Sequence, residues 1–369
     1  MKLLHVVPTY LPARRYGGPI VAVHGLCKAL VARGHEVHVF TTNVDGDGTL
    51  DVAPHTTLDG VQVRYFPSTF PRLYWSPAMR EALHHTGAFD LVHIHAVYLW
   101  PGVAAAKAAR SAHVPYVISP RGMLVPELIR QKSAVVKTAW LKLVERRGFA
   151  HAAGIHFTAD LEWREALRVG LPLPSPFVVP NGIDIERRPD VPRDDRTLVF
   201  LGRVNWKKGL DAVIAALPSL PGVQFVIAGN DEEALTPRLM ETAARLGVAE
   251  RVTFVGPVYG AKKYELLARA TLFVLTSRSE NFGNAVLEAL MMETPAVLSS
   301  DVGLADEVVA AEAGIIGLDG VSELLRDPER RARMGRNGRA LVESRFAWPR
   351  VAQEMENAYQ CSIRSRRSS

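Results

Sequence analysis

Residues 272–300 read LFVLTSRSENFGNAVLEALMMETPAVLSS, and the order of apolar, small and charged residues in this stretch indicates the fold class. It predicts a short apolar strand, a turn rich in Ser, Gly and Asn, a helix and a second strand. Glu280 lies in the turn, Gly283 just ahead of the helix, and Glu288 in the second helical turn. A strand, a helix and a further strand in this order are typical of an α/β protein with a parallel sheet.

The start of this helix is a candidate site for a diphosphate, because its first backbone N–H groups lack partners and carry a partial positive charge. Gly283 has no side chain to block a ligand there. Such a unit suits a sugar nucleotide, with sugar hydroxyls on one carboxylate and ribose hydroxyls on the other. Taken alone, the spacing of Glu280 and Glu288 more often means a solvated acid and an amphipathic core helix.

The pattern S-x-S-E-N-F-G-x-x-x-L-E-A-L over residues 277–290 closely resembles the nucleotide-sugar signature of glycosyltransferase family 4, retaining enzymes of the GT-B fold. The resemblance implies that Glu280 and the amides that follow it contact the donor sugar. It also implies that Glu288 binds the ribose. Carried over by position, the donor-binding turn consists of Asn281, Phe282, Gly283 and Asn284.

Length and composition agree with a soluble or peripheral protein of two domains. The 369 residues are 48% hydrophobic, enough for two cores, and no apolar run approaches a membrane span. The only cysteines, Cys27 and Cys361, match no zinc spacing and suit a reducing cytosol. The net charge of +6 indicates phosphorylated ligands or an anionic membrane face, or simply a basic surface. We expect no nucleic-acid partner and a cytoplasmic location.

Strands and helices alternate along the first half, which predicts right-handed crossovers and a parallel sheet covered on both faces. The expected strands are 3–7, 36–42, 61–66, 90–95, 115–119, 154–158 and 177–179, and the expected helices are 20–32, 76–85, 102–112, 135–147 and 160–169. The second half repeats the pattern, with strands at 197–202, 223–228, 251–255, 272–275, 295–298 and 314–316.

The turn after the first strand contains Tyr16-Gly17-Gly18-Pro19 and lacks G-x-G-x-x-G, which disfavours a dinucleotide-binding dehydrogenase. Paired glycines before a helix are compatible with phosphate contact or with a plain flexible loop. The family resemblance favours donor-phosphate contact by Gly18, and Tyr16 is a candidate on the acceptor side.

The segment 90–95, DLVHIH, ends a strand, and alternation places His93 and His95 on one face. A histidine at a strand end is more often structural than catalytic. The resemblance places a histidine here, at the carboxyl edge of the first sheet and near the sugar ring. It favours His95, with His93 as the alternative, in the role of orienting the donor by a hydrogen bond.

Two further segments of the first half bear on the acceptor. Residues 119–124, SPRGML, resemble a segment of bacterial polysaccharide glycosyltransferases. The resemblance implies that this segment faces the acceptor, and we expect Arg121 to meet a phosphate there. Basic and apolar residues then interleave over 130–147, which suits either a helix lying on an anionic membrane or an ordinary surface helix whose Trp140 packs on the sheet.

The second domain opens with the strand TLVFLG, followed by Arg203 and then by Lys208 before a helix. Two cations at one strand-to-helix turn suit a departing diphosphate and supply the charge that a metal otherwise provides. By itself R-x4-K is common and usually solvated, but G-R-V-x-x-x-K-G resembles the family's diphosphate clamp. No Asp-x-Asp motif lies in the right setting, so we expect no metal and no cofactor beyond the donor substrate.

These observations predict an α/β protein with two doubly wound Rossmann-like domains facing across a cleft, the GT-B fold. The acceptor-side domain is expected over 1–185, with the final helix, about 346–361, packing back on it, and the nucleotide-sugar domain over 190–345. Two departures from the family pattern are Glu293, where a glycine is usual, and a short segment 314–325. If Glu293 is left-handed, a side chain there costs roughly 1 kcal/mol.

The predicted reaction is retaining transfer of a hexosyl group from a UDP- or GDP-sugar to an acceptor hydroxyl. By resemblance, the acceptor is a lipid-linked or growing surface glycan, such as an exopolysaccharide, at the cytosolic face of the inner membrane. The alternatives are a nucleotide-sugar epimerase of the same fold and a catalytically silent nucleotide-sugar-binding protein.

Overall fold

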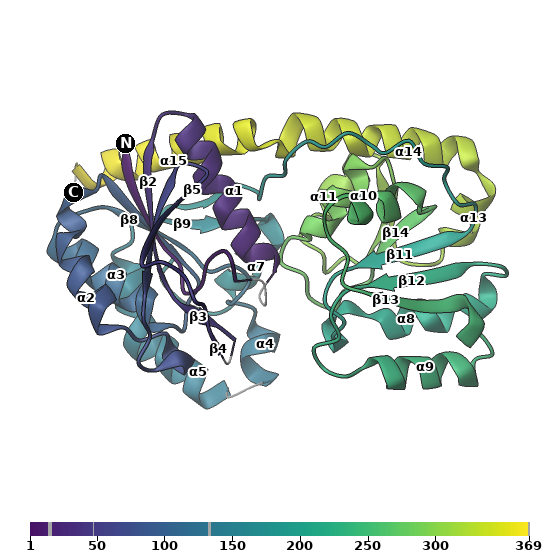
Figure 1. The fold of residues 1–369 in the computed structure, drawn as a ribbon, viewed down its shortest axis with the longest axis horizontal. Helices are drawn as coiled ribbons and strands as arrows, with labels where there is room; N and C mark the ends of the chain where they lie inside the picture. Colours follow the sequence, from purple (N-terminus) through teal and green to yellow (C-terminus); the bar gives the residue numbers. More distant parts are fainter. Residues whose placement is uncertain (14–16, 47, 132–133, 368–369) are drawn as a thin grey trace. The chain divides into compact units, whose positions relative to one another are not determined.

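A computed structural model describes residues 1–13, 17–46, 48–131 and 134–367 (Figure 1). The chain forms two compact units, the first made of Met1–Gly182 and Trp348–Ser369 and the second of Ile183–Ala347. Within the second unit, its first residue bonds to a residue near its end: the Ile183 N–H donates to the Phe346 carbonyl at 2.8 Å. Each unit is described separately below.

The first unit is built on an eight-stranded sheet in the order β10-β9-β8-β7-β1-β2-β6-β5. All neighbours pair in parallel except β5 with β6. The strands are β1 (Lys2–Val6), β2 (Glu36–Thr42), β5 (His55–Leu58), β6 (Val61–Phe66), β7 (Leu91–His95), β8 (Tyr116–Ser119), β9 (Gly154–Phe157) and β10 (Pro176–Val178). A separate two-stranded sheet pairs β3 (Val44–Asp45) with β4 (Gly48–Thr49).

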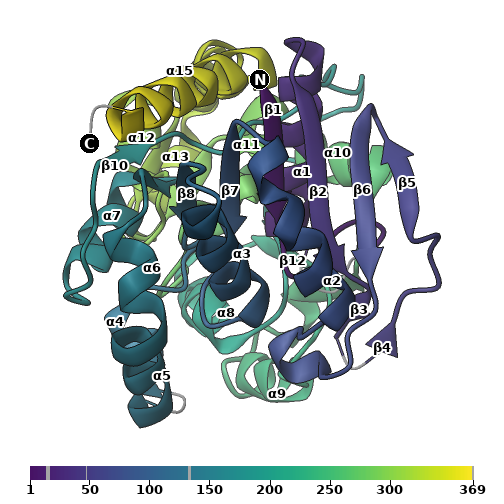
Figure 2. The same ribbon diagram turned by 90° about the vertical axis from the view of Figure 1, so that its left-hand side faces the viewer.

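Helices cover both faces of this sheet, and each face has its own buried core. One core includes residues of α2 (Pro77–Ala82) and α3 (Trp100–Ser111), which lie along β2, β1 and β7 (Figure 2). The other includes residues of α1 (Gly18–Ala32) and α15 (Trp348–Arg367). The remaining α-helices are α4 (Pro126–Gln131), α5 (Ala134–Trp140), α6 (Arg146–Ala150) and α7 (Asp160–Leu167).

The second unit has a wholly parallel sheet in the order β13-β12-β11-β14-β15-β16. Its strands are β11 (Thr197–Leu201), β12 (Gln224–Ala228), β13 (Val252–Gly256), β14 (Leu272–Leu275), β15 (Ala296–Leu298) and β16 (Gly314–Ile316). Its α-helices are α8 (Leu210–Ala216), α9 (Thr236–Arg245), α10 (Gly260–Arg269), α11 (Asn284–Met291), α12 (Ala305–Ala310), α13 (Val321–Arg326) and α14 (Pro328–Leu341).

The predicted α/β class and the two parallel sheets are confirmed, and each expected strand matches an observed one to within a residue or two. In each sheet the strand order reverses at one place, between β1 and β7 in the first unit and between β11 and β14 in the second. Ligands of such sheets bind outside the carboxyl ends of the strands at this switch point. The carboxyl ends of the parallel strands lie along one edge of each sheet, and we call this edge the carboxyl edge.

Three details differ from the sequence-based expectation. The helix expected over 135–147 is broken by a π-helical turn at Leu141–Glu145, where Glu145 turns inward and accepts from the Trp140 indole and the Tyr98 N–H. The final helix runs on to Arg367 and not only to residue 361, because Ser362 is buried against the first unit. The edge strand β5 was not expected, since HTTL lacks an apolar alternation.

Candidate functional site

In the second unit, the chain segments that follow β11 and β14 are bonded to each other across the switch point. Gly209 has a φ of 64°, and a Cβ there would lie 2.1 Å from the Thr276 carbonyl oxygen. The Thr276 hydroxyl donates to the Gly209 carbonyl at 2.9 Å, and the Arg278 N–H donates to the Lys207 carbonyl at 2.7 Å. Only glycine allows this approach, so the two segments are held in one arrangement.

Lys208 and Glu280 meet at this junction. The Lys208 ammonium donates to a carboxylate oxygen of Glu280, and the two side chains are only 16% and 20% exposed. The structure therefore brings together the lysine predicted to bind diphosphate and the acid predicted to bind the sugar.

Arg203, the other predicted cation, lies at the same edge with a different partner. Its guanidinium donates to the carboxylate of Glu232, in the segment after β12, at 3.1 and 3.2 Å. The Arg203 side chain is 46% exposed, which leaves part of the guanidinium accessible to a ligand. The two cations thus have separate carboxylate partners, and Glu232 was not among the predicted residues.

The turn between Glu280 and α11 is fixed by backbone hydrogen bonds. The Glu280 N–H donates to the Asp301 carbonyl, and the Gly303 N–H donates to the Glu280 carbonyl, both at 2.9 Å. Gly283 precedes α11 with a φ of 99°, a left-handed conformation that glycine adopts without strain. Asn281 and Asn284 are half-buried in this turn.

Phe282 differs from its neighbours in this turn because its side chain is 3% exposed and packs against Phe346, with ring centroids 6.1 Å apart. The ring therefore anchors the turn to the core of the second unit. Only the backbone of Phe282 is left to contact a ligand.

Glu288 is paired with Lys263, a residue that the sequence did not single out. The Lys263 ammonium lies 2.7 Å from one Glu288 oxygen, and the side chains are 18% and 20% exposed. Burial disfavours the charged lysine, but the adjacent Glu288 carboxylate outweighs burial and raises the pKa of Lys263 above its usual value. Lys263 lies in the first turn of α10, just after β13, so it too stands at the carboxyl edge.

In the first unit, His95 ends β7 and lies in a buried network. The Arg121 guanidinium reaches the His95 Nδ1 at 3.3 and 3.4 Å, and the His95 Nε2 lies 3.0 Å from the His5 Nδ1. Arg121 also donates to Asn181 at 2.8 Å. Arginine only donates, so the His95 Nδ1 must accept, and the Nε2–H of His95 then donates to His5.

His93, the alternative to His95, has a different role in this network. Its Nδ1 lies 2.6 Å from the hydroxyl of Tyr359, which α15 brings to the sheet. Burial strongly lowers the pKa of both His93 and His95, and in His95 the charge of Arg121 adds to the effect. Both histidines are therefore neutral at pH 7.

His5, His93 and His95 present nitrogens within 4.8 Å of one another, the spacing of a possible metal site. The chemistry of the cluster fits hydrogen bonding better. Two nitrogens of His5 and His95 lie 3.0 Å apart, closer than the ~3.3 Å expected for two ligands of a tetrahedral zinc ion. Arg121, at 3.3 Å from His95, would also repel a cation. No metal is therefore assigned to these histidines.

Several residues with a left-handed backbone lie at the same carboxyl edge of the first unit. Ala96 and Tyr98, just after β7, have φ values of 70° and 66°, and Arg121, just after β8, has a φ of 55°. A left-handed backbone costs free energy at any residue other than glycine, and residues with this conformation cluster at functional sites. Gly18 begins α1 in the segment after β1, and Tyr16 lies outside the described residues.

The segment after α4 carries exposed apolar and basic side chains. Val135, Val136 and Leu143 are 83%, 67% and 82% exposed. Exposed basic residues accompany them at Lys142, Arg146 and Arg147. Among the described residues, no helix has the length and apolarity that a membrane span requires.

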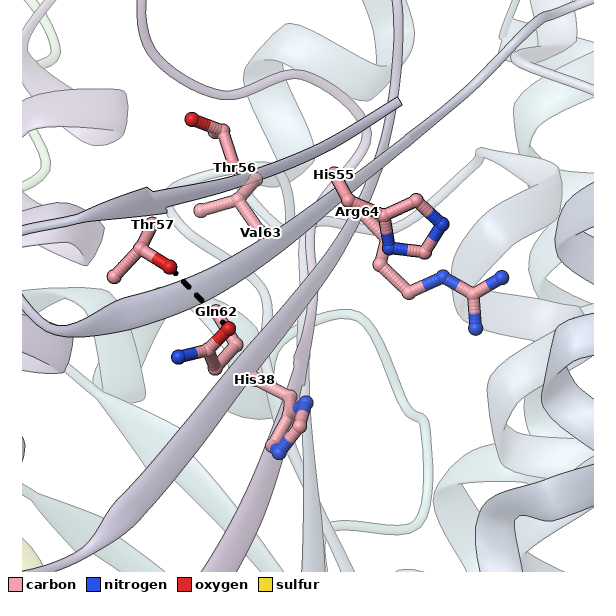
Figure 3. A pocket seen from close by; sticks show the side chains of 7 residues that line it. All are labelled: His38, His55, Thr56, Thr57, Gln62, Val63 and Arg64. Atoms are coloured by element: carbon pink, nitrogen blue, oxygen red, sulfur yellow. Dashed lines mark hydrogen bonds between the residues drawn. The ribbon is translucent and has the colours of Figure 1, made fainter. Parts of the chain in front are cut away.

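A hollow of about 250 Å³ also lies on the first unit and is lined by residues of β2, β5 and β6 (Figure 3). Its lining includes His38 and Gln62, which lie near the starts of β2 and β6. The hollow is therefore away from the carboxyl edge that carries His95 and Arg121, and we do not assign it to the candidate site.

Comparisons with known proteins agree with the fold. The model of the "Glycosyl transferase 4-like domain" matches residues 17–182, and that of "Glycosyl transferases group 1" matches residues 183–341. An uncharacterized glycosyltransferase of Methanocaldococcus jannaschii is 26% identical over 98% of this chain and 99% of its own length. A glycogen synthase of Mycobacterium tuberculosis is 29% identical, with 100% of this chain and 96% of that protein covered.

Solved structures show the same fold at lower identity. The sucrose-phosphate synthase of Thermosynechococcus elongatus superimposes with a TM-score of 0.77 at 19% identity, covering 99% of both chains. HepE of Anabaena, solved in complex with UDP and glucose, has a TM-score of 0.75 at 20% identity and covers 98% of this chain and 99% of its own.

Proposed function

The chain belongs to the GT4-like glycosyltransferases of the GT-B fold, and we propose that it moves a hexosyl group from a UDP- or GDP-sugar to an acceptor hydroxyl with retained anomeric configuration. The acceptor is a lipid-linked or growing surface glycan, such as an exopolysaccharide. Apart from the acceptor, the donor is the only small molecule that the proposed reaction requires.

One observation carries this proposal: the half-buried ion pair of Lys208 and Glu280 lies at the switch point of the second sheet. Glu280 comes three residues before Gly283, the glycine that precedes α11. A diphosphate placed at the start of α11 meets the positive end of the helix. Lys208 lies beside that position and supplies a full positive charge.

The negative charge that develops on the leaving diphosphate is balanced by Lys208 and Arg203. Positively charged groups aimed at developing charge stabilise the transition state most where water is excluded. Lys208 is 16% exposed and meets this condition better than Arg203, at 46%. With two cations and a helix start at the diphosphate, we propose that transfer needs no metal.

Glu288 and Lys263 form the nucleoside end of the proposed donor site. Lys263 binds one carboxylate oxygen of Glu288 and keeps the side chain in one orientation. The ribose hydroxyls then donate to the other oxygen. Recognition of two neighbouring hydroxyls by one oxygen requires a fixed carboxylate, so Lys263 acts as a positioning residue in our proposal.

The relatives bear on the donor. HepE of Anabaena was solved with UDP-glucose and with UDP, which supports a uridine nucleotide as the first donor to test. The exposed apolar and basic surface on residues 134–150 supports peripheral contact with an anionic membrane, as a lipid-linked acceptor would need.

The proposal is tested by thermal shift with UDP-glucose, GDP-glucose, GDP-mannose, UDP and GDP, followed by assay of free nucleotide with and without acceptor. A ligand at 100 times its Kd stabilises by about 2.7 kcal/mol, which for a unit of this size raises Tm by roughly 5–10 °C. Lys208→Met and Glu288→Gln should abolish the shift. Arg269→Met, which breaks an exposed pair with Asp194 at the far end of α10, should keep it.

The outcomes separate the proposed enzyme from its alternatives. Nucleotide release that depends on acceptor supports transfer. Interconversion of nucleotide sugars without acceptor would mean an epimerase, and a thermal shift without any release or donor hydrolysis would mean a silent binding protein. No shift with any nucleotide would refute the donor site itself.

A further inference from the structure

A short, rigid turn follows β6 at the carboxyl edge of the first unit. Phe70 and Trp75 pair across it in an antiparallel bridge, with the Trp75 N–H donating to the Phe70 carbonyl at 3.3 Å. The Trp75 carbonyl in turn accepts from the Thr69 N–H at 2.9 Å and from the Ser68 hydroxyl at 3.0 Å. The turn is therefore closed by several hydrogen bonds that hold its backbone in a defined conformation.

This turn displays aromatic rings to solvent. Phe70 is 51% exposed and Trp75 is 37% exposed. Residues that face each other across an antiparallel pair project to the same side, so the two rings are neighbours on one surface. Tyr74, between them in sequence, is buried and has a φ of 56°. The turn therefore contains a strained residue whose side chain points inward, while the neighbouring rings are exposed.

A third ring joins them from another strand. Trp100 is half-buried at the start of α3, just after β7, and its ring lies 6.4 Å from that of Trp75 at an angle of 72°. In the sheet, β1 and β2 separate β7 from β6. The contact therefore joins two segments that follow β6 and β7 at the carboxyl edge, on either side of β1 and β2.

We propose that Phe70, Trp75 and Trp100, here called the aromatic edge, form a binding subsite for a hexose ring of the acceptor glycan. One face of a hexose carries mainly C–H bonds, which pack on the face of an aromatic ring, while its hydroxyls stay hydrated or bond polar neighbours. This inference rests on the proposed function, because it assigns the sugar class that the first unit receives.

The composition of the surface favours a sugar over a lipid chain. The aromatic edge has flat rings in fixed positions, and the exposed Arg72 lies within the same turn and can hydrogen-bond hydroxyls. A group of exposed aliphatic side chains of the first unit, Val135, Val136 and Leu143, lies elsewhere, beside several cations. Exposed aliphatic side chains beside cations are what we expect of a surface that inserts into lipid.

The position favours the acceptor in particular. The aromatic edge shares the carboxyl edge of the first sheet with His95, Arg121 and the strained residues after β7. Ligands of doubly wound sheets bind at this edge. In our proposal residues of the second unit hold the diphosphate and the nucleoside of the donor. The aromatic edge belongs to the first unit, so we assign it to the acceptor.

Saturation-transfer NMR tests the proposal with methyl glucoside, galactoside and mannoside, cellobiose and maltose as probes, on the full chain. The wild type should transfer saturation to the protons on one ring face of at least one probe. Trp75→Ala and Phe70→Ala should each weaken binding of that probe about five- to tenfold, the scale of one aromatic stacking contact. Trp75→Phe should keep most of it.

Leu167→Ala, at an exposed apolar residue of the same unit, is the matched control and should leave sugar binding unchanged. The UDP-glucose thermal shift shows that each variant is folded and tests the donor site independently. Absence of saturation transfer from the wild type to every sugar overturns the inference while leaving the donor site intact. Loss of binding to vesicles of phosphatidylcholine and phosphatidylglycerol in Trp75→Ala, with sugar binding unchanged, also overturns it in favour of a membrane contact.

Discussion

Replacing Glu293 by glycine should stabilise the second unit. Glu293 follows α11 with a φ of 58°, the left-handed conformation for which glycine is usual at the end of a helix. Its backbone is fixed from outside, since Arg193 donates to its carbonyl at 2.9 Å and α14 packs on it so closely that a Cβ on Gly335 would lie 2.3 Å from that oxygen. The conformation should therefore persist in the variant.

The magnitude follows from three contributions. A side chain in the left-handed region costs about 1–2 kcal/mol, and this cost disappears in glycine. Glycine adds about 0.5–1 kcal/mol of lost chain entropy on folding. The Glu293 carboxylate also attracts the Arg193 guanidinium. Burial lowers the pKa of Arg193 to about 10, and the charge of Glu293 opposes this shift. The glycine variant loses this attraction. We expect a net gain of about 0.5 kcal/mol over the wild type.

Glu293→Ala isolates the backbone contribution, because it loses the charge but keeps a Cβ. The glycine variant should exceed the alanine variant by about 1 kcal/mol in native-state hydrogen exchange of β14 and β15, and by roughly 2–4 °C in calorimetric Tm. At Ala332, an exposed position within α14, the same comparison should have the opposite sign. A glycine variant no more stable than the alanine variant would refute the reasoning.

Three further predictions concern the core of each unit and the exposed cation. Gly209→Ala should destabilise the second unit by about 2 kcal/mol or more in urea denaturation, because its Cβ would overlap the Thr276 carbonyl. Acidification below pH 6.5 should destabilise the first unit, because burial, then Arg121, lowers the pKa of His5 to about 3, so the unfolded chain binds more protons than the folded one. The free energy of unfolding from urea denaturation should fall by about 1.4 kcal/mol per pH unit for each such histidine. Arg203→Gln should change stability by less than about 1 kcal/mol, since its ion pair is exposed, yet weaken UDP binding in calorimetric titration.

Local sequence pattern was enough to predict most of the fold. Strands buried on both faces give continuous apolar runs, so β11 and β14 are visible as TLVFL and LFVL. The edge strand β5 was missed because HTTL lacks an apolar alternation and is a strand only through its pairing with the adjacent β6. The break at Leu141–Glu145 was missed because it depends on contacts with a residue far along the chain: the π-helical turn places Glu145 against the Tyr98 N–H.

The candidate site was predictable only in part, because the sequence identifies charged residues but not the oppositely charged side chains that pair with them. The patterns around Arg203, Lys208, Glu280 and Glu288 could be read as motifs. Their partners could not: Lys263 lies in an ordinary helix start, and Glu232 in a loop after a different strand. The pairs arise because parallel strands bring their following segments to one edge, and the order of the strands decides which segments meet.

The Lys208–Glu280 pair has a consequence for donor binding. A lysine as buried as Lys208 needs a balancing charge when no anion is bound, because an unpaired buried charge costs several kcal/mol. Glu280 provides that charge, so a diphosphate has to compete with it, and the carboxylate it displaces becomes free to accept sugar hydroxyls. Glu280→Gln should therefore bind UDP about fivefold more tightly, the equivalent of about 1 kcal/mol, but gain less for UDP-glucose, which also loses its sugar contact. Calorimetric titration of both ligands measures the difference, and equal weakening of UDP and UDP-glucose would show that Glu280 does not exchange partners with the diphosphate.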